Sequence, residues 1–209
     1  MTIIKICGIN TLKDALAAIE AGADYLGFIF YPKSVRIIEK SACAEITSVL
    51  KREHTQSKLV GVFVNSSVEE IKDILQTCHL DLAQLHGDET PEIFAQLTPH
   101  AFRAFRGIPE SNAGYERDEA PTMLSDAAVK GVYGGSGVTA DWTAAAELAK
   151  KYPLLLAGGL TPENVADAVR LVQPWGVDVA SGVESAPGEK DEEKMSAFVK
   201  AVREVENQS

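Results

Sequence analysis

The chain has 209 residues, of which 45% are hydrophobic and 24% are charged, as is usual for a folded globular protein. The 20 basic and 30 acidic residues give a formal net charge of −10, which disfavours nucleic acid as a partner because its recognition needs a basic face. No apolar run approaches membrane-spanning length and the first residues lack a signal-peptide pattern, so we expect a cytoplasmic protein with no membrane partner.

Apolar segments rich in β-branched residues alternate with amphipathic segments along the chain, which is typical of strand–helix units. The first predicted strand, Ile3–Cys7, is followed by Gly8, which permits a turn, and by Thr11, a candidate N-cap. Ser67 and Glu70 have the spacing of a capping box and predict the start of a helix. The other elements predicted in the first half are strands at 25–30, 59–64 and 82–85 and helices at 12–21, 41–52 and 91–97.

In the second half we predict strands at 102–105, 122–125, 154–157 and 177–180 and helices at 162–172 and 192–205. Asp141 is a candidate N-cap for a further helix that ends near Lys151. Residues 110–119 lack a clear apolar stripe, so at most a short or irregular helix is expected there.

Eight strand–helix units in 209 residues leave about 26 residues for each unit, enough for a strand, a helix and two short connections. This spacing, with no linker or low-complexity segment, predicts an α/β fold in which residues 1–209 form one (β/α)8 barrel domain of parallel strands. A doubly wound open sheet is the alternative, but its usual Gly-x-Gly-x-x-Gly is absent after the first strand.

A barrel of this type gathers the carboxyl ends of its strands at one mouth, where active sites lie. The residues expected there include a thiol, cations, an imidazole and a carboxylate: Cys7, Arg36, Asn65, His86, Arg106 and Asp126. Side chains alternate along a strand, so Lys5 and Cys7 share one face of the first strand. A cysteine after an apolar run is often only a small core residue, and the sequence leaves this alternative open for Cys7.

Glycines follow each of the last three predicted strands: Gly134, Gly135 and Gly137, then Gly158 and Gly159, then Gly182 after Ser181. Barrels frequently bind phosphate in the loops after their last two strands, through backbone N–H groups. Glycines also simply permit tight turns, but three clusters on adjacent loops favour a phosphate site. Because the whole chain is negatively charged, local cations and N–H groups must supply the binding of an anionic ligand.

Four other residues are candidates for supporting the site. Arg36 has the side chain that forks onto a carboxylate or a phosphate, and for His86 we favour a supporting role. Lys5 and Asp178 lie on the first and last strands, which are neighbours in a closed barrel, so we expect a buried ion pair beneath the site. The three cysteines lack Cys-x-x-Cys spacing and no His–carboxylate cluster has ligand spacing, so neither a disulfide framework nor a metal is expected.

Cys7 and Asp126 are the candidate base and acid. A thiolate abstracts a proton when nearby cations or N–H groups lower its pKa, and a carboxylic acid donates one when desolvation raises its pKa. Such a pair, acting without a cofactor, suits the isomerisation of a sugar phosphate by proton transfer.

Blocks of sequence in a fixed order carry a resemblance to a known family. They are Lys5-Ile6-Cys7-Gly8-Ile9, then 27–30 with 32–36, 61–65, 84–89, 156–160 with 162–165, 177–179 with 181–184, and 188–191. Each block alone is weak, but together they cover nearly the whole chain. The sequence resembles the phosphoribosylanthranilate isomerase family of tryptophan biosynthesis.

The resemblance implies an Amadori rearrangement of N-(5-phosphoribosyl)anthranilate to 1-(2-carboxyphenylamino)-1-deoxyribulose 5-phosphate, without cofactor or metal. It implies that protonated Asp126 gives a proton to the furanose ring oxygen, that Cys7 as thiolate removes the C2′ proton, and that Arg36 holds the anthranilate carboxylate. The substrate-binding set that we expect beside Arg36 is His86, Gly135, Gly137, Gly158, Gly159, Asp178, Ser181 and Gly182. The expected assembly is a monomer or a homodimer.

The sequence departs from the family pattern at Ser125, Ser136 and Ala140. A related barrel isomerase that serves both the histidine and tryptophan pathways has an Asp where Cys7 stands and a longer chain. Indole-glycerol-phosphate synthase would need catalytic lysines and a glutamate that are not evident. A catalytically inactive barrel that binds a phosphate ligand or serves as a structural partner is the remaining alternative, and the acid–base pair argues against it.

Overall fold

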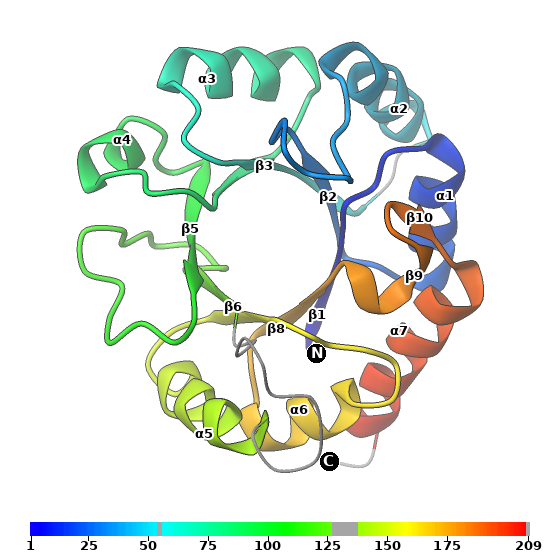
Figure 1. The fold of residues 1–209 in the computed structure, drawn as a ribbon, viewed down its shortest axis with the longest axis vertical. Helices are drawn as coiled ribbons and strands as arrows, with labels where there is room; N and C mark the ends of the chain where they lie inside the picture. The colour runs from blue at the N-terminus through cyan, green and yellow to red at the C-terminus, as the bar shows by residue number, and fades with distance from the viewer. Residues whose placement is uncertain (54–55, 127–137, 208–209) are drawn as a thin grey trace.

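The computed structural model describes residues 1–53, 56–126 and 138–207, and within 138–141 the backbone alone. Eight parallel strands close into a barrel in chain order, and Figure 1 looks along its axis. The strands are β1 (Ile3–Cys7), β2 (Tyr25–Ile29), β3 (Lys58–Phe63), β4 (Leu82–Leu85), β5 (Ala101–Arg106), β6 (Met123–Asp126), β7 (Leu154–Ala157) and β8 (Gly176–Val179). Because β1 pairs with both β2 and β8, the predicted barrel is confirmed and the open doubly wound sheet is excluded.

Helices surround the strands as an outer ring (Figure 1). They are α1 (Leu12–Ala21), α2 (Lys40–Arg52), α3 (Val68–Thr77), α4 (Pro91–Ala95), α5 (Val138–Ala149), α6 (Val165–Val172) and α7 (Glu192–Glu206). The predicted caps are confirmed: the Thr11 hydroxyl accepts from the Asp14 N–H at 3.0 Å and that of Ser67 accepts from the Glu70 N–H at 3.1 Å. No helix of the described residues combines the length and the apolar composition needed to cross a membrane.

The prediction of eight strand–helix units is wrong between β5 and β6, where residues 107–122 hold no helix. This segment lacks an apolar stripe, and hydrogen bonds from polar side chains fix its backbone conformation instead. The Asn112 amide donates to the carbonyl oxygens of Tyr115 and Thr122, each at 3.0 Å. Asn112 and Arg117 are both buried. The segment is therefore fixed by hydrogen bonds to its own backbone rather than by a packed helix face.

Two helix starts also differ from the prediction. Asp141 lies within α5, which begins at Val138, so its assignment as an N-cap is wrong. The predicted helix 162–172 begins only at Val165, because Asn164 ties down the preceding turn. Its side-chain oxygen accepts from the Thr161 N–H at 2.8 Å and its amide donates to the Gly159 carbonyl at 3.0 Å.

Three further elements follow β8 and were not predicted. A short 3₁₀ helix, η1 (Ser181–Val183), leads into a hairpin of β9 (Glu184–Ala186) and β10 (Glu189–Lys190). In Figure 1 this orange segment lies beside β1 and α1, so it returns toward the N-terminal strand.

The strand faces separate two layers of the core. Ile4 and Ile6 belong to the large apolar cluster between the strands and the helices, whereas a second cluster contains only strand residues and fills the barrel. The members of this inner cluster are Tyr25, Val60, Leu82, Phe102, Ala104, Leu124, Leu155 and Ala157. Lys5 and Cys7, which alternate with the two isoleucines, therefore point into the barrel.

Candidate active site

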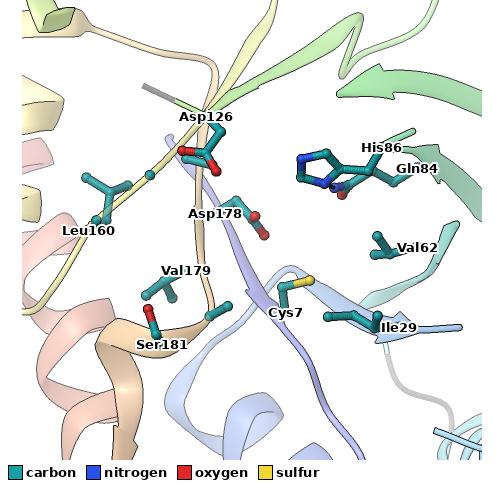
Figure 2. Close-up of a pocket in the computed structure, with 14 residues that line it drawn as sticks. Cys7, Ile29, Val62, Gln84, His86, Asp126, Leu160, Asp178, Val179 and Ser181 are labelled. Atoms are coloured by element: carbon teal, nitrogen blue, oxygen red, sulfur yellow. Dashed lines mark hydrogen bonds between the residues drawn. The ribbon is translucent and has the colours of Figure 1, made fainter. Parts of the chain in front are cut away.

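The carboxyl ends of the strands surround a cavity of about 190 Å³, shown in Figure 2. Its lining includes seven residues that the sequence predicted for the site: Cys7, His86, Asp126, Gly158, Gly159, Asp178 and Ser181. Arg36 and Gly182 lie outside this lining, and Gly135 and Gly137 fall outside the described residues. The barrel thus brings together the thiol, the imidazole and two carboxylates that lie far apart in the sequence.

Cys7 ends β1 beside a buried charge pair. Lys5 Nζ donates to Asp178 Oδ1 at 2.6 Å, and the Lys5 side chain is fully buried, so the predicted ion pair is confirmed. Burial raises the pKa of the Cys7 thiol above its usual value, although Lys5 opposes this rise. Gly27 leaves room for the sulfur, because a Cβ at that position would lie 2.7 Å from Cys7 Sγ.

Asp126 ends β6, and its carboxylate stands across the cavity from Cys7 (Figure 2). Two hydrogen bonds fasten this strand end to the turn after β5. The Ser125 hydroxyl donates to the Gly107 carbonyl at 2.6 Å, and the Gly107 N–H donates to the Asp126 carbonyl at 2.8 Å. The departure at Ser125 therefore adds a partly buried hydrogen bond directly before the candidate acid.

His86 follows β4 and points toward the cavity (Figure 2). Desolvation by burial lowers its pKa below the ordinary value, so the neutral imidazole is favoured at neutral pH. Its Nδ1 lies 3.2 Å from Gln84 Nε2, within hydrogen-bond distance. A neutral ring in this position can accept or donate a hydrogen bond but does not attract an anion by charge.

The loops after β7 and β8 meet at two glycine turns. Gly158 and Gly159 have φ values of 100° and 65°, a conformation that disfavours other residues. Gly182 lies against the neighbouring loop so closely that a Cβ there would overlap the carbonyl oxygen of Leu160. Both turns adjoin Ser181 at the cavity wall, and backbone N–H groups of such turns can hold an anion.

Arg36 lies over the turn that follows β1. Gly8 has a φ of 79°, and a Cβ on it would come within 2.7 Å of Arg36 Cδ, so this glycine makes room for the arginine stem. The Arg36 N–H donates to the Ser34 hydroxyl at 3.1 Å, which fixes the local loop. The guanidinium binds Glu184, with Nε to Oε1 at 2.6 Å and Nη2 to Oε2 at 2.7 Å.

Glu184 and Lys190 were not predicted as site residues, although both lie in blocks that carry the resemblance. Lys190 Nζ donates to Glu184 Oε1 at 2.9 Å and to the Ala180 carbonyl at 3.0 Å. The side chains of Lys190 and Glu184 are 0% and 4% exposed. The sequence shows only that an acidic and a basic residue lie in neighbouring blocks of the family resemblance. The hairpin of β9 and β10, which the sequence did not predict, brings both side chains to Arg36.

A second buried pair supports the loop after β4. Arg103 Nη1 donates to Glu89 Oε2 at 2.9 Å, and the Glu89 carboxylate accepts from the N–H groups of Asn65 and Gly87. Asn65, expected at the mouth, is thereby directed to this loop, and its side chain accepts from the Asp88 N–H at 2.6 Å. Arg106 is exposed and does not line the cavity, so neither Asn65 nor Arg106 belongs to the cavity wall.

The described residues contain no group of three or more His, Cys, Asp and Glu side chains placed to hold a metal ion. All three cysteines are buried free thiols. The side chains that line the cavity include a thiol, two carboxylates and an imidazole.

A family model described as N-(5′phosphoribosyl)anthranilate (PRA) isomerase matches residues 4–201. The N-(5′-phosphoribosyl)anthranilate isomerase of Roseiflexus sp. (strain RS-1) is 47% identical over 209 residues, which cover 96% of this chain and 97% of that protein. The crystal structure of phosphoribosyl anthranilate isomerase from Thermotoga maritima has a TM-score of 0.85 and 36% identity, covering 98% of this chain and 100% of that one. A crystal structure of the isomerase in complex with reduced 1-(o-carboxyphenylamino)-1-deoxyribulose 5-phosphate has a TM-score of 0.81 and 33% identity, with coverages of 98% and 100%.

Proposed function

The chain belongs to the N-(5′-phosphoribosyl)anthranilate isomerase family, whose aldose–ketose isomerisation it carries out in tryptophan biosynthesis, and we propose that Cys7 and Asp126 are its base and acid. The observation that carries this assignment is that both residues line one cavity, from strands β1 and β6, which are not neighbours. A substrate between them presents its two sides to different groups. An acid and a base that act on opposite sides of one sugar need this separation.

In the proposed reaction the Asp126 carboxylic acid transfers its proton to the furanose ring oxygen, and the C1′–O bond breaks to leave a Schiff base at C1′. The Cys7 thiolate then removes the proton from C2′, and the electron pair of that C–H bond forms the enolamine. Tautomerisation of the enolamine gives the ketone at C2′ and a methylene at C1′. No cofactor enters any of these steps.

The charges around Cys7 favour its thiolate more than the net charge of the chain suggests. Three cations, Lys5, Arg36 and Lys190, interact electrostatically with Cys7, and they are paired with the carboxylates of Asp178 and Glu184. Three positive and two negative charges leave one positive charge, which a thiolate neutralises. Because burial still raises the pKa of Cys7, turnover is expected to rise with pH as this thiol ionises.

The remaining assignments concern substrate binding. We assign the anthranilate carboxylate to Arg36, and sugar hydroxyls to Asp178 and the neutral His86, both of which line the cavity. The phosphate is assigned to the glycine loops after β6, β7 and β8, through N–H groups at Gly158, Gly159, Ser181 and Gly182. We add Gly135 and Gly137 to this set from the sequence alone.

The other proposals concern the whole chain. We propose that residues 1–209 act as one barrel domain on phosphoribosylanthranilate, as a monomer or a homodimer in the cytoplasm. Light scattering at several concentrations tests the assembly. The alternative, an inactive barrel that binds a phosphate ligand, predicts binding of the product without turnover.

The test follows the fluorescence of anthranilate compounds. The labile substrate is generated in place from anthranilate and phosphoribosyl pyrophosphate by an excess of the transferase, and wild type is compared with Cys7→Ser and Asp126→Asn. Each variant is expected to lose about 10²- to 10⁴-fold in kcat, the contribution typical of general acid–base groups. Product binding is expected to remain. A folded wild type that binds product without turnover would favour the inactive barrel, and variants that lose binding as much as turnover would make these residues structural.

A further inference from the structure

We propose that Glu184 is a positioning residue that fixes the guanidinium of Arg36. The Nη1–Nη2 edge of the arginine then remains available to bind a planar carboxylate of the substrate. The inference rests on the proposed role of Arg36 as the carboxylate anchor. It adds that the selectivity for a carboxylate depends on a residue that does not touch the substrate.

The first support is the geometry of the pair. Nε and Nη2 of Arg36 donate to separate oxygens of Glu184 at 2.6 and 2.7 Å, a two-point contact that sets both the position and the plane of the guanidinium. The arginine side chain is 22% exposed and the glutamate only 4%. The glutamate therefore forms the buried side of the pair and the arginine the side that reaches solvent.

The second support is the number of donors. A guanidinium carries five N–H groups, one on Nε and two on each Nη. The contact with Glu184 uses the Nε–H and one Nη2–H, which leaves both N–H groups on Nη1 and one on Nη2. The two terminal nitrogens form a second fork of the same shape as the first, and a carboxylate fits this fork with two parallel hydrogen bonds.

The third support is that Glu184 is held independently of Arg36. Lys190 Nζ lies 2.9 Å from Glu184 Oε1, and Lys194 Nζ donates to the Glu184 carbonyl at 2.7 Å. Burial alone would raise the pKa of Glu184, but the hydrogen bonds and charges of Arg36 and Lys190 lower it by more. The pKa therefore lies below its ordinary value, and the group remains a carboxylate at neutral pH. A charged and fixed glutamate can orient an arginine whose own loop is partly exposed.

The fourth support is that three loops meet around this pair. The arginine stem crosses Gly8 of the loop after β1, and its backbone belongs to the loop after β2. Gly188, in the hairpin after β8, packs against the loop after β2: a Cβ on Gly188 would lie 3.0 Å from the Val35 carbonyl oxygen. The Asn10 amide donates to the Gly188 carbonyl at 3.1 Å and joins the first loop to the hairpin.

The test is a double-mutant cycle of Arg36→Met and Glu184→Gln with the substrate assay described above. Freeing a side chain that must be ordered again on binding costs a factor of about three to ten in affinity, so Glu184→Gln is expected to raise KM by that factor. Because Glu184 acts through Arg36, the double variant is expected to have the KM of Arg36→Met alone.

Two further measurements separate positioning from damage to the fold. Inhibition by ribulose 5-phosphate, which lacks the anthranilate carboxylate, is expected to be unchanged in Glu184→Gln. The second variant, Glu184→Gln with Lys190→Met, removes both buried charges and is expected to show the same rise in KM. The matched control is Asp24→Asn, whose carboxylate pairs with Arg203 at 2.9 Å at the amino end of the barrel and should leave KM unchanged.

The outcomes distinguish the two levels of the proposal. If Arg36→Met leaves KM unchanged, the proposed carboxylate anchor is wrong. If Arg36→Met raises KM but Glu184→Gln lowers it or leaves it unchanged, or if the two effects multiply, the positioning role of Glu184 is overturned. Weaker inhibition by ribulose 5-phosphate in the glutamate variant would also overturn it, because the defect would then extend beyond the carboxylate.

Discussion

Replacing Lys5 with methionine removes the charge that faces both Asp178 and Cys7 while keeping a side chain of similar length. In the folded protein Lys5 Nζ lies 2.6 Å from Asp178 Oδ1, with side-chain exposures of 0% and 11%. The substitution therefore leaves a largely buried carboxylate without its partner. Two effects are expected, one on the free energy of unfolding and one on the ionisation of Cys7.

The size of the first effect follows from the geometry. At an effective dielectric constant of about 20, two unit charges at this separation attract by about 6 kcal/mol, part of which offsets the cost of desolvation. Removing one partner of a buried pair costs about 3 to 5 kcal/mol, and we expect the lower end because Asp178 faces the cavity. For a chain of this size a loss of about 3 kcal/mol lowers Tm by roughly 6 to 12 °C.

The second effect is on pH dependence. Burial lowers the pKa of Lys5, but Asp178 and Cys7 raise it by more, so its folded-state pKa exceeds the ordinary value. The stabilisation by Lys5 is therefore fully present below the unfolded-state pKa of about 10.4 and is lost as pH rises through the folded-state value. Without Lys5, burial raises the pKa of Cys7 with less opposition, so the rise of kcat/KM with pH moves to higher pH.

Thermal and urea unfolding across pH, together with the pH profile of turnover, measure both effects. The control is Lys5→Met combined with Asp178→Leu, which removes the unpaired charge and should recover most of the stability but not the activity. An unchanged Tm in the single variant would show that the pair contributes nothing to stability. An unchanged pH profile would refute the electrostatic influence of Lys5 on the thiol.

Two other substitutions test separate parts of the site. Gly182→Ala places a methyl group against the Leu160 carbonyl, so it should push the loops after β7 and β8 apart. Thermal unfolding should show a loss of about 2 kcal/mol in stability, and the fluorescence assay should show a higher KM. An unaltered KM would show that their close approach is not needed for binding. Burial lowers the pKa of His86, so below about pH 6.5 the unfolded chain binds a proton more readily than the native protein does. The free energy of unfolding therefore declines as pH falls through this range, by at most about 1.4 kcal/mol per pH unit. His86→Gln should flatten this decline in urea titrations, and an equal slope in both proteins would contradict the burial of a neutral imidazole.

Local features of this fold could be predicted from the sequence because their causes are local. The caps at Thr11 and Ser67 depend on residues three positions apart, and the strands follow from short apolar runs. The prediction failed where a local signal admitted two structures. Asp141 is a good N-cap residue but stands inside α5, and residues 107–122 lack the stripe that a helix needs.

The site was predictable only to the extent that the barrel determines it. Once eight strands were expected, their carboxyl ends placed Cys7, His86 and Asp126 around one cavity. The pairing of Arg36 with Glu184 joins residues 148 positions apart and depends on how the hairpin after β8 returns to the loop after β2. No periodicity or spacing records such a contact, because its geometry is set by tertiary packing.

The segment between β5 and β6 has a consequence for how the protein opens. Its buried positions are polar or proline, namely Asn112, Arg117, Pro121 and Thr122. The Tyr115 hydroxyl also donates to the Glu89 carbonyl at 2.8 Å. Opening this segment breaks these hydrogen bonds and separates the Tyr115 ring from the rings of Phe94 and Phe105, 5.6 and 5.9 Å away between centroids. It exposes less apolar surface than the unfolding of the whole barrel. Native-state hydrogen exchange should therefore find here an opening whose free energy depends less steeply on denaturant than that of the strands, where exchange should follow global unfolding.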